Sequence, residues 1–257
     1  MLKVTPVQAL RDNYIWLIHG ADPGKVAVVD PGDARPVLQA LEEQGLAAVA
    51  ILLTHHHPDH SGGIPRLREA LEIPAWGPAK EPVSGLTAQV AGGDRVELPE
   101  LGLSFEVLDI PGHTAGHIAF HGHGALFCGD TLFSAGCGRL FEGTPAQMLH
   151  SLDTLAGLPD ATRIYCGHEY TLANLRFARA VEPGNPEIAQ HAERVEILRE
   201  EDTPSLPSTL ALEKRINPFL RCDEPAVKHS AAERAGRPLA SRIEVFAAVR
   251  RWKDEFA

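Results

Sequence analysis

The chain has 257 residues, of which 44% are hydrophobic and 23% are charged, and its formal net charge is -10 at pH 7. This length allows one large domain, or one domain with a smaller appendage, and the composition is typical of a globular protein. The acidic balance argues against a nucleic-acid partner, because phosphate groups are bound by positively charged surfaces.

The sequence carries no mark of a membrane or secreted protein. No uninterrupted apolar stretch is long enough to span a bilayer, and residues 1–6 lack the basic start and apolar core of a secretion signal. The four cysteines show no CxxC spacing, so we expect no disulfide framework. We therefore expect a cytoplasmic protein with no membrane partner. We also expect a monomer, since no long apolar patch argues for an obligate dimer.

Short β-like runs alternate with helical patterns as far as about residue 170. Strands are predicted at residues 26–30, 49–53, 105–108, 118–120, 125–128 and 163–166. Helices are predicted from an N-cap at Asp33 to a stop at Gly45, around residues 65–71, and after the cap Thr144. The glycine-rich turn at residues 121–124 is typical of a hairpin, so we expect sheets that are not purely parallel.

The character of the chain changes after His168. Helical patterns cover residues 172–181, 187–201 and 241–256, and no convincing strand is found there. Proline-rich segments separate these patterns. We predict an α/β domain at residues 1–171, followed by a helical domain at residues 172–257.

The most informative motif is the run of four histidines and one aspartate within residues 55–60. Imidazole and carboxylate are common ligands of zinc and related metals. Alternate residues of an extended backbone face the same way, so His55 and His57 can share one ion while His56 points elsewhere. Pro58 then forces a turn that frees Asp59 and His60 for a second ion.

Three further candidates follow glycines near predicted strand ends, where sites gather in sheet-based folds. They are His113, Asp130 and His168. The residues divide into one ligand set for each of two divalent ions, with Asp130 bridging both: His55, His57 and His113 for the first, and Asp59, His60 and His168 for the second. Such a set leaves a position for a shared water, whereas a structural zinc site is closed by four ligands.

Each candidate has a simpler interpretation when it is taken alone. The cluster at residues 55–60 could be a histidine-rich surface loop, and His113 or Asp130 could be an ordinary turn residue. His168 could be a histidine satisfied inside the core. Their joint occurrence at successive strand ends favours metal binding.

These motifs resemble the metallo-β-lactamase superfamily, which implies an αββα sandwich of two mixed sheets. Later segments narrow the resemblance to the glyoxalase II (hydroxyacylglutathione hydrolase) family: Cys137–Thr144, Tyr165–Thr171, Val181–Asn185 and Val249–Lys253. The resemblance covers essentially the whole chain. It implies that residues 1–171 form the catalytic domain and that residues 172–257 form a helical substrate-binding domain.

In that family glutathione lies between the two parts, and the corresponding positions here are Arg139, Phe141, Tyr170, Arg250 and Lys253. Glutathione carries carboxylates, which arginine and lysine can bind. Some family members have lysine and tyrosine where this chain has Arg139 and Phe141. This departure affects one side-chain hydrogen bond to the peptide, and leaves the chemistry unchanged.

The resemblance implies a metal-dependent thioester hydrolase that converts S-D-lactoylglutathione, and other S-2-hydroxyacylglutathiones, to glutathione and the 2-hydroxy acid. A hydroxide bridging the two metals would attack the thioester carbonyl, with Asp59 and Asp130 in catalytic roles as metal ligands. The metals expected are zinc, with iron or manganese also compatible. The alternative is a mononuclear-iron glutathione persulfide dioxygenase of the same superfamily.

Overall fold

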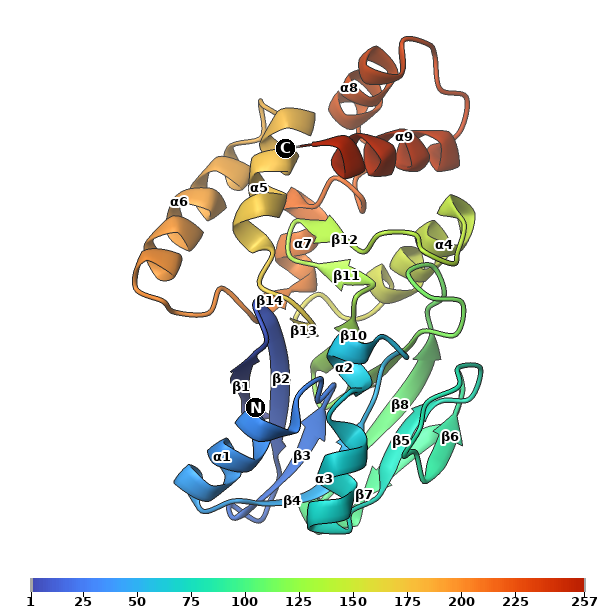
Figure 1. Cartoon of the computed structure of the whole chain (residues 1–257). Coiled ribbons are helices and arrows are strands. Elements are labelled where there is room, and N and C mark those ends of the chain that lie inside the picture. Colours follow the sequence, from blue (N-terminus) through green and yellow to red (C-terminus); the bar gives the residue numbers. More distant parts are fainter. Residues whose placement is uncertain (1, 257) are drawn as a thin grey trace.

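Two six-stranded sheets form the larger part of the molecule (Figure 1). The computed structural model describes residues 2–256. The first sheet contains, in spatial order, β1 (Val4–Ala9), β2 (Asn13–His19), β3 (Lys25–Val29), β4 (Ala47–Leu52), β5 (Ala75–Pro78) and β6 (Ala88–Val90). The strands β1 to β3 pair antiparallel, and β3 to β6 pair parallel.

The second sheet contains, in spatial order, β14 (Ser208–Thr209), β13 (Arg163–Cys166), β10 (Ala125–Gly129), β9 (Ile118–Gly122), β8 (Leu103–Asp109) and β7 (Arg95–Leu98). Only β10 and β13 are parallel neighbours in it, so the prediction of mixed sheets is confirmed. His123 and Gly124 turn the chain between β9 and β10 with positive φ angles of 52° and 73°. Tight hairpin turns require this left-handed backbone, which explains the glycine there.

Several helices lie in the first 170 residues. They are α1 (Ala34–Gln44), α2 (Pro58–Ser61), α3 (Ile64–Leu71), the short 3-10 helix η1 (Pro99–Leu101) and α4 (Pro145–Ala156). Asp33 caps α1 by accepting a hydrogen bond from the Arg35 amide, and Gly45 ends it in a left-handed conformation. Thr144 and Gln147 form a reciprocal capping box at the start of α4.

The C-terminal part is mostly helical, but it is not free of strands. Its helices are α5 (Thr171–Val181), α6 (Pro186–Glu200), α7 (Leu210–Ile216), α8 (Pro225–Ala235) and α9 (Arg242–Glu255). The expectation of no strand after His168 is wrong, because β14 pairs with β13 at the edge of the second sheet. A strand of two residues is too short to show the alternating pattern by which strands are predicted. It is recognised only by its pairing with β13.

The largest hydrophobic cluster fills the space between the sheets and continues into the helices. It joins Trp16, Phe105 and Phe127 of the sheets to Phe177 of α5 and Phe246 of α9. A separate cluster packs α1 and α3 on the other face of the first sheet. The predicted αββα sandwich with a C-terminal helical region is confirmed, while a division between residues 171 and 172 stays a prediction. Within residues 2–256, no helix combines the length and the apolar character needed to cross a membrane.

Candidate metal centre

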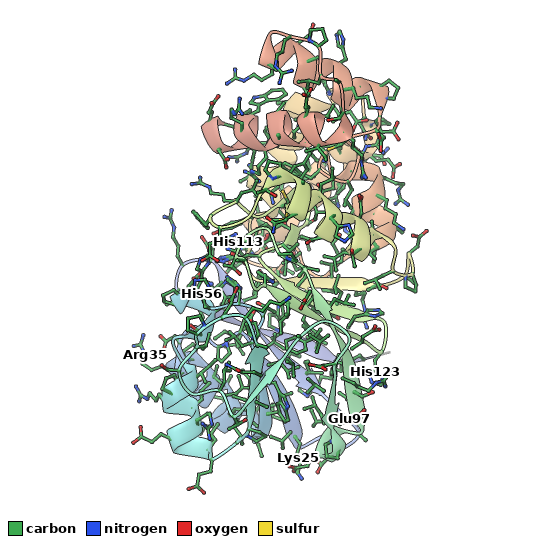
Figure 2. The ribbon with its side chains drawn as sticks, turned by 90° about the vertical axis from the view of Figure 1, so that its right-hand side faces the viewer. Lys25, Arg35, His56, Glu97, His113 and His123 are labelled. Carbon is green, nitrogen blue, oxygen red and sulfur yellow. The ribbon has the colours of Figure 1, made fainter. Side chains whose placement is uncertain are left out.

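The predicted metal ligands gather at one end of the sandwich, beside the helical part. In Figure 2, His113 and His56 lie at this end, whereas Lys25 and Glu97 mark the opposite end. The ligands follow β4, β8, β10 and β13 in the chain. The strand β4 belongs to the first sheet and the other three strands belong to the second, so the strand ends that carry the ligands come from both sheets. The site is built from loops at the common end of both sheets.

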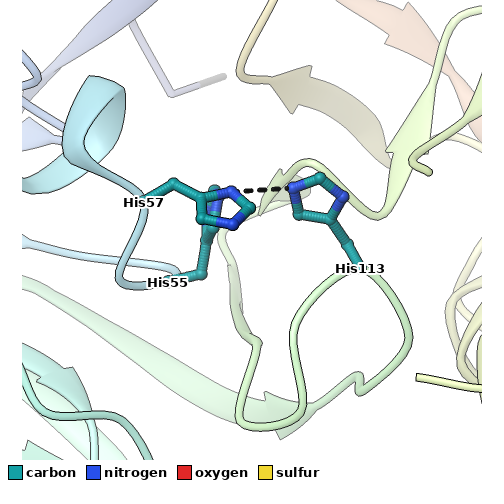
Figure 3. A group of neighbouring side chains, drawn as sticks. All are labelled: His55, His57 and His113. Atoms are coloured by element: carbon teal, nitrogen blue, oxygen red, sulfur yellow. Dashed lines mark hydrogen bonds between the residues drawn. The ribbon is translucent and has the colours of Figure 1, made fainter. Parts of the chain in front are cut away.

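The first predicted ligand set, His55, His57 and His113, forms a compact triad (Figure 3). Nδ1 of His57 lies 3.1 Å from Nε2 of His55 and 3.1 Å from Nε2 of His113. Tetrahedral zinc with nitrogen ligands separates those nitrogens by about 3.3 Å, so the triad has the size that one ion needs. His56 points elsewhere, as predicted, and its two ring nitrogens face Glu81 and Glu142.

The second predicted set, Asp59, His60 and His168, also forms a group. Nε2 of His60 and Nε2 of His168 are 3.3 Å apart, and Oδ2 of Asp59 lies 3.4 Å from Nε2 of His168. Pro58 is the first residue of α2, which turns the chain between the two sets. The turn expected at this proline therefore separates the ligand groups.

Asp130 contacts both groups. Its Oδ2 lies 3.4 Å from Nε2 of His113 and 3.3 Å from Nε2 of His168, and its Oδ1 lies 3.3 Å from Nε2 of His60. This Oδ1 is buried and has no hydrogen-bond partner among residues 2–256. A buried oxygen without a donor, facing ring nitrogens that are themselves free to accept, fits a bound cation. The structure brings all seven predicted ligands together, and their binding of metal stays a prediction.

Hydrogen bonds from outside the cluster orient the imidazoles. Nδ1 of His113 donates to the carbonyl of Arg139 at 2.8 Å. Nδ1 of His60 faces Oδ2 of Asp30 at 3.1 Å, and Nδ1 of His168 faces Oδ1 of Asp12 at 2.8 Å. Each bond leaves Nε2 free for an ion. Asp12 and Asp30 were not predicted from the sequence, in which the one signal is that Asp30 is an acidic residue at the end of a predicted strand.

His117 lies beside the centre as a supporting residue. Its ring is fully buried and stacks on His55, with centroids 4.5 Å apart. Its Nδ1 donates to the carbonyl of Ile118, and its Nε2 accepts the backbone N–H of Asp130 at 3.2 Å. With both nitrogens engaged, His117 orients Asp130 and His55.

The protonation states of His55 and Asp130 match the needs of metal ligands. Burial lowers the pKa of His55 well below its usual value, which keeps this imidazole neutral. Burial alone would raise the pKa of Asp130, but the neighbouring His60 and His168 hold it well below its usual value. Neutral imidazole and ionised carboxylate are the forms that bind metals. Burial opposes protonation of His60 and His168, but Asp130 raises the pKa of His60 well above its usual value and that of His168 to about 10, so these two rings must release a proton when an ion binds.

Glycines allow the ligand loops to approach one another. A Cβ atom on Gly167 would lie 2.5 Å from Cε1 of His60 and 2.6 Å from Oδ1 of Asp130. A Cβ atom on Gly138 would lie 1.9 Å from the backbone oxygen of Asp130. Side chains at these positions would occupy the space of the ligands themselves.

A cavity of about 550 Å³ opens over the cluster. It is lined by every residue predicted to contact substrate, namely Arg139, Phe141, Tyr170, Arg250 and Lys253. It is also lined by five predicted ligands, namely His57, Asp59, His113, Asp130 and His168. A second cavity of about 670 Å³, near α1, contains none of the predicted ligands. The first cavity is therefore the candidate substrate site.

The aromatic walls of this cavity touch the ligand histidines. Phe141 is 63% exposed, and its ring centroid lies 5.2 Å from that of His113. Tyr170 stacks on His168, with centroids 4.6 Å apart. Both aromatic residues therefore lie where a substrate approaching the cluster would pass.

The three predicted cations differ in availability. Arg250 is 5% exposed, and it donates to the backbone oxygen of Cys137 and to Asp254. The side chain of Arg139 is 64% exposed, with a single weak ion pair to Asp254 at 3.7 Å. Burial and the nearby Arg250 and Arg139 lower the pKa of Lys253 to about 8. Nζ of Lys253 donates to the backbone oxygen of Ala173 at 3.1 Å, a bond that it would exchange for one to a ligand, while Arg250 supports the wall. Arg139 is thus the most exposed of the three cations.

Two family models match consecutive parts of the chain. Residues 10–168 match the metallo-β-lactamase superfamily, and residues 169–256 match the hydroxyacylglutathione hydrolase C-terminus. The crystal structure of ETHE1 from Myxococcus xanthus has a TM-score of 0.67 and 26% identity, covering 97% of this chain and 89% of that one. The structure of TTHA1623 in a di-iron-bound form has a TM-score of 0.60 and 28% identity, covering 84% of this chain and 100% of that one.

Full-length relatives share about half of the sequence. Hydroxyacylglutathione hydrolase from Nitrosomonas eutropha is 55% identical over 256 residues, which is 100% of both chains. Hydroxyacylglutathione hydrolase from Photobacterium profundum is 55% identical over 257 residues, again 100% of both. The chain therefore belongs to the hydroxyacylglutathione hydrolase family of the metallo-β-lactamase superfamily.

Proposed function

We propose that the chain hydrolyses S-2-hydroxyacylglutathiones, S-D-lactoylglutathione in particular, to glutathione and the 2-hydroxy acid. One observation carries the proposal: five of the seven clustered ligand candidates line a single cavity whose opposite wall comes from the helical part. That wall includes Lys253 and Tyr170, which lie in the segment that matches the hydroxyacylglutathione hydrolase C-terminus. The thioester of such a substrate would thus lie beside the ligand cluster of the sandwich, and its glutathione peptide would contact the helical part.

The donor set supports two divalent ions, of which we propose zinc first, with iron or manganese as alternatives. His55, His57 and His113 would hold one ion, Asp59, His60 and His168 the other, and Asp130 both. Such a pair of ions would supply a hydroxide at neutral pH and would polarise the thioester carbonyl. The charges of Asp59 and Asp130 favour the retention of both cations.

The remaining residues bind and orient the substrate. We assign the glutathione carboxylates to Arg139 and Lys253, and the apolar contacts beside the cluster to Phe141 and Tyr170. Arg250 fixes the Cys137 carbonyl and so supports the loop that carries Arg139. Glutathione leaves as a thiolate, which is a good leaving group and requires no dedicated general acid. We further propose a cytoplasmic monomer.

The decisive experiment follows the thioester absorbance of S-D-lactoylglutathione with purified protein before chelation, after chelation and after metal is restored. Hydrolysis that stops on chelation and returns with metal is expected. Protein that contains its metals but leaves the thioester intact would disprove the substrate assignment. Oxygen uptake with glutathione persulfide, measured on the same sample, tests the alternative dioxygenase activity directly.

A further inference from the structure

The turn between β1 and β2 lies against the segment that carries His168. The backbone N–H of Tyr14 donates to the carbonyl of Gly167 at 2.8 Å, and that of Glu169 donates to the carbonyl of Asp12 at 2.9 Å. Asn13 and His168 form an isolated antiparallel bridge. The backbone of the turn is therefore in register with the ligand segment, although more than 150 residues separate them in the chain.

Two side chains of this turn, those of Asp12 and Asn13, form hydrogen bonds to ligands of the second group. Oδ1 of Asp12 accepts a hydrogen bond from Nδ1 of His168 at 2.8 Å, which directs Nε2 of this ring toward Asp59. Nδ2 of Asn13 donates to Oδ2 of Asp59 at 3.1 Å and to its backbone oxygen at 3.2 Å. Asn13 is only 5% exposed, so its amide is held in place by packing.

The first ligand group is oriented by other parts of the chain. His113 bonds to the carbonyl of Arg139, and His55 contacts the hydroxyl of Thr54. The buried Glu81 accepts the backbone N–H groups of His56 and Gly116, and thereby joins the two loops that carry this group. The contacts made by Asp12 and Asn13 go to the second group alone.

We propose that Asp12 and Asn13 are positioning residues for the second ion, and that they set its affinity while the ion held by His55, His57 and His113 is unaffected. The proposal rests on the dinuclear site of the proposed function. Groups that orient metal ligands from outside typically change metal affinity by about 10- to 100-fold. Asp12 orients an imidazole through a charged hydrogen bond, and Asn13 fixes which oxygen of Asp59 faces the ion.

The test is a titration of the metal-free protein with Zn²⁺ in competition with a chromophoric chelator, which resolves the two affinities. Asp12→Asn keeps an acceptor without the charge, so we expect about a tenfold loss at one ion. Asp12→Ala and Asn13→Ala remove the contact, so losses near 100-fold are expected. Arg11→Gln is the matched control, since Arg11 is an exposed residue of the same turn, and both of its affinities should equal those of the wild type.

Reloading with Co²⁺ identifies the ion that is lost, because a site of three histidines with one carboxylate and a site of two histidines with two carboxylates give different absorption bands. Retention of the three-histidine bands in Asp12→Ala is the expected result. Equal losses at both ions, or no loss in any variant whose metal-free form unfolds at the wild-type temperature, would overturn the inference. If the wild-type protein binds only one ion, both this inference and the proposal of a dinuclear site are wrong. If it binds two ions but does not hydrolyse the thioester, only the substrate assignment is wrong.

Discussion

At the scale of single residues, Asp130 is the strongest test of a shared metal centre, because its carboxylate faces both histidine groups. Asp130→Asn replaces one ligand oxygen by an amide nitrogen that does not bind metal, and it removes a negative charge. We expect both ions to weaken together, by more than the roughly 10- to 100-fold that outer groups cause, and turnover to be abolished.

Metal content by elemental analysis and the thioester assay check this prediction together. Asp22→Asn, an exposed aspartate at residues 21–24, is the control and should behave as wild type. Two retained ions with full activity in Asp130→Asn would rule out the bridging role.

A substitution at Gly167 tests whether the ligand loops need the space left by the absent side chain, without changing a ligand. A methyl group at this position would lie within 2.6 Å of both His60 and Asp130, so these ligands must move. Gly167→Ala should therefore reduce kcat/KM at least tenfold, which corresponds to about 1.4 kcal/mol. Gly184→Ala is the matched control, since nothing lies within 4 Å of a Cβ there. Equal rates for the two variants would show that the ligand loops can yield without loss.

The residues that the sequence revealed and those that it concealed differ in a physical way. One motif of six positions contains four of the candidate ligands, so the sequence alone indicates a metal site there: His55, His57, Asp59 and His60. Asp12 reaches His168 from 156 residues away, and neither residue type signals this partner. Supporting contacts of this kind depend on the register of distant strands, which local patterns do not specify.

At the scale of elements, α9 carries the cation that should give binding its pH dependence. Burial, followed by the charges of Arg250 and Arg139, lowers the pKa of Lys253 to about 8. The ammonium group is present below this pH and is lost above it, so its attraction for a glutathione carboxylate weakens as pH rises. We expect kcat/KM to fall about tenfold above pH 8, because hydrogen bonds to charged groups contribute about 1.5–3 kcal/mol.

Lys253→Arg separates this effect from other titrations. A guanidinium stays charged throughout the range, so the fall near pH 8 should disappear from its profile. Lys253→Met should give a low kcat/KM on both sides of pH 8. A fall near pH 8 that persists in both variants would assign it to another group.

The elements also show where sequence patterns succeed. The caps at Asp33 and Thr144 and the stop at Gly45 were predictable, because each depends on its immediate neighbours. The family resemblance singled out Arg250 and Lys253, and both line one cavity, while their contact with substrate stays a prediction. It did not reveal that Arg250 is engaged with Cys137 and Asp254, since those bonds come from tertiary packing.

At the scale of the whole molecule, the sandwich and the helices share one core. The largest hydrophobic cluster includes Trp16 of β2 and both Phe246 and Val249 of α9. The strand β14 adds a further link, because it enters the second sheet from between α6 and α7. In addition, the buried Glu213 of α7 accepts hydrogen bonds from Ser134 and from the backbone of Ala135. A cleft wall built across such a junction keeps its shape only while both parts are folded.

We therefore predict that the helical part does not open on its own before the sandwich does. Native-state hydrogen exchange should give the slowest amides of β2 and of α9 the same free energy of opening, equal to that of global unfolding. The physical reason is that releasing α9 would expose Phe246 and Val249 and uncover the aromatic cluster beneath them. The exposed end of α6 serves as the internal control, since Glu200 and Glu201 should exchange much faster. If the α9 amides open at a clearly lower free energy than those of β2, the helical part is a separate cooperative unit, and substrate entry could then involve its release.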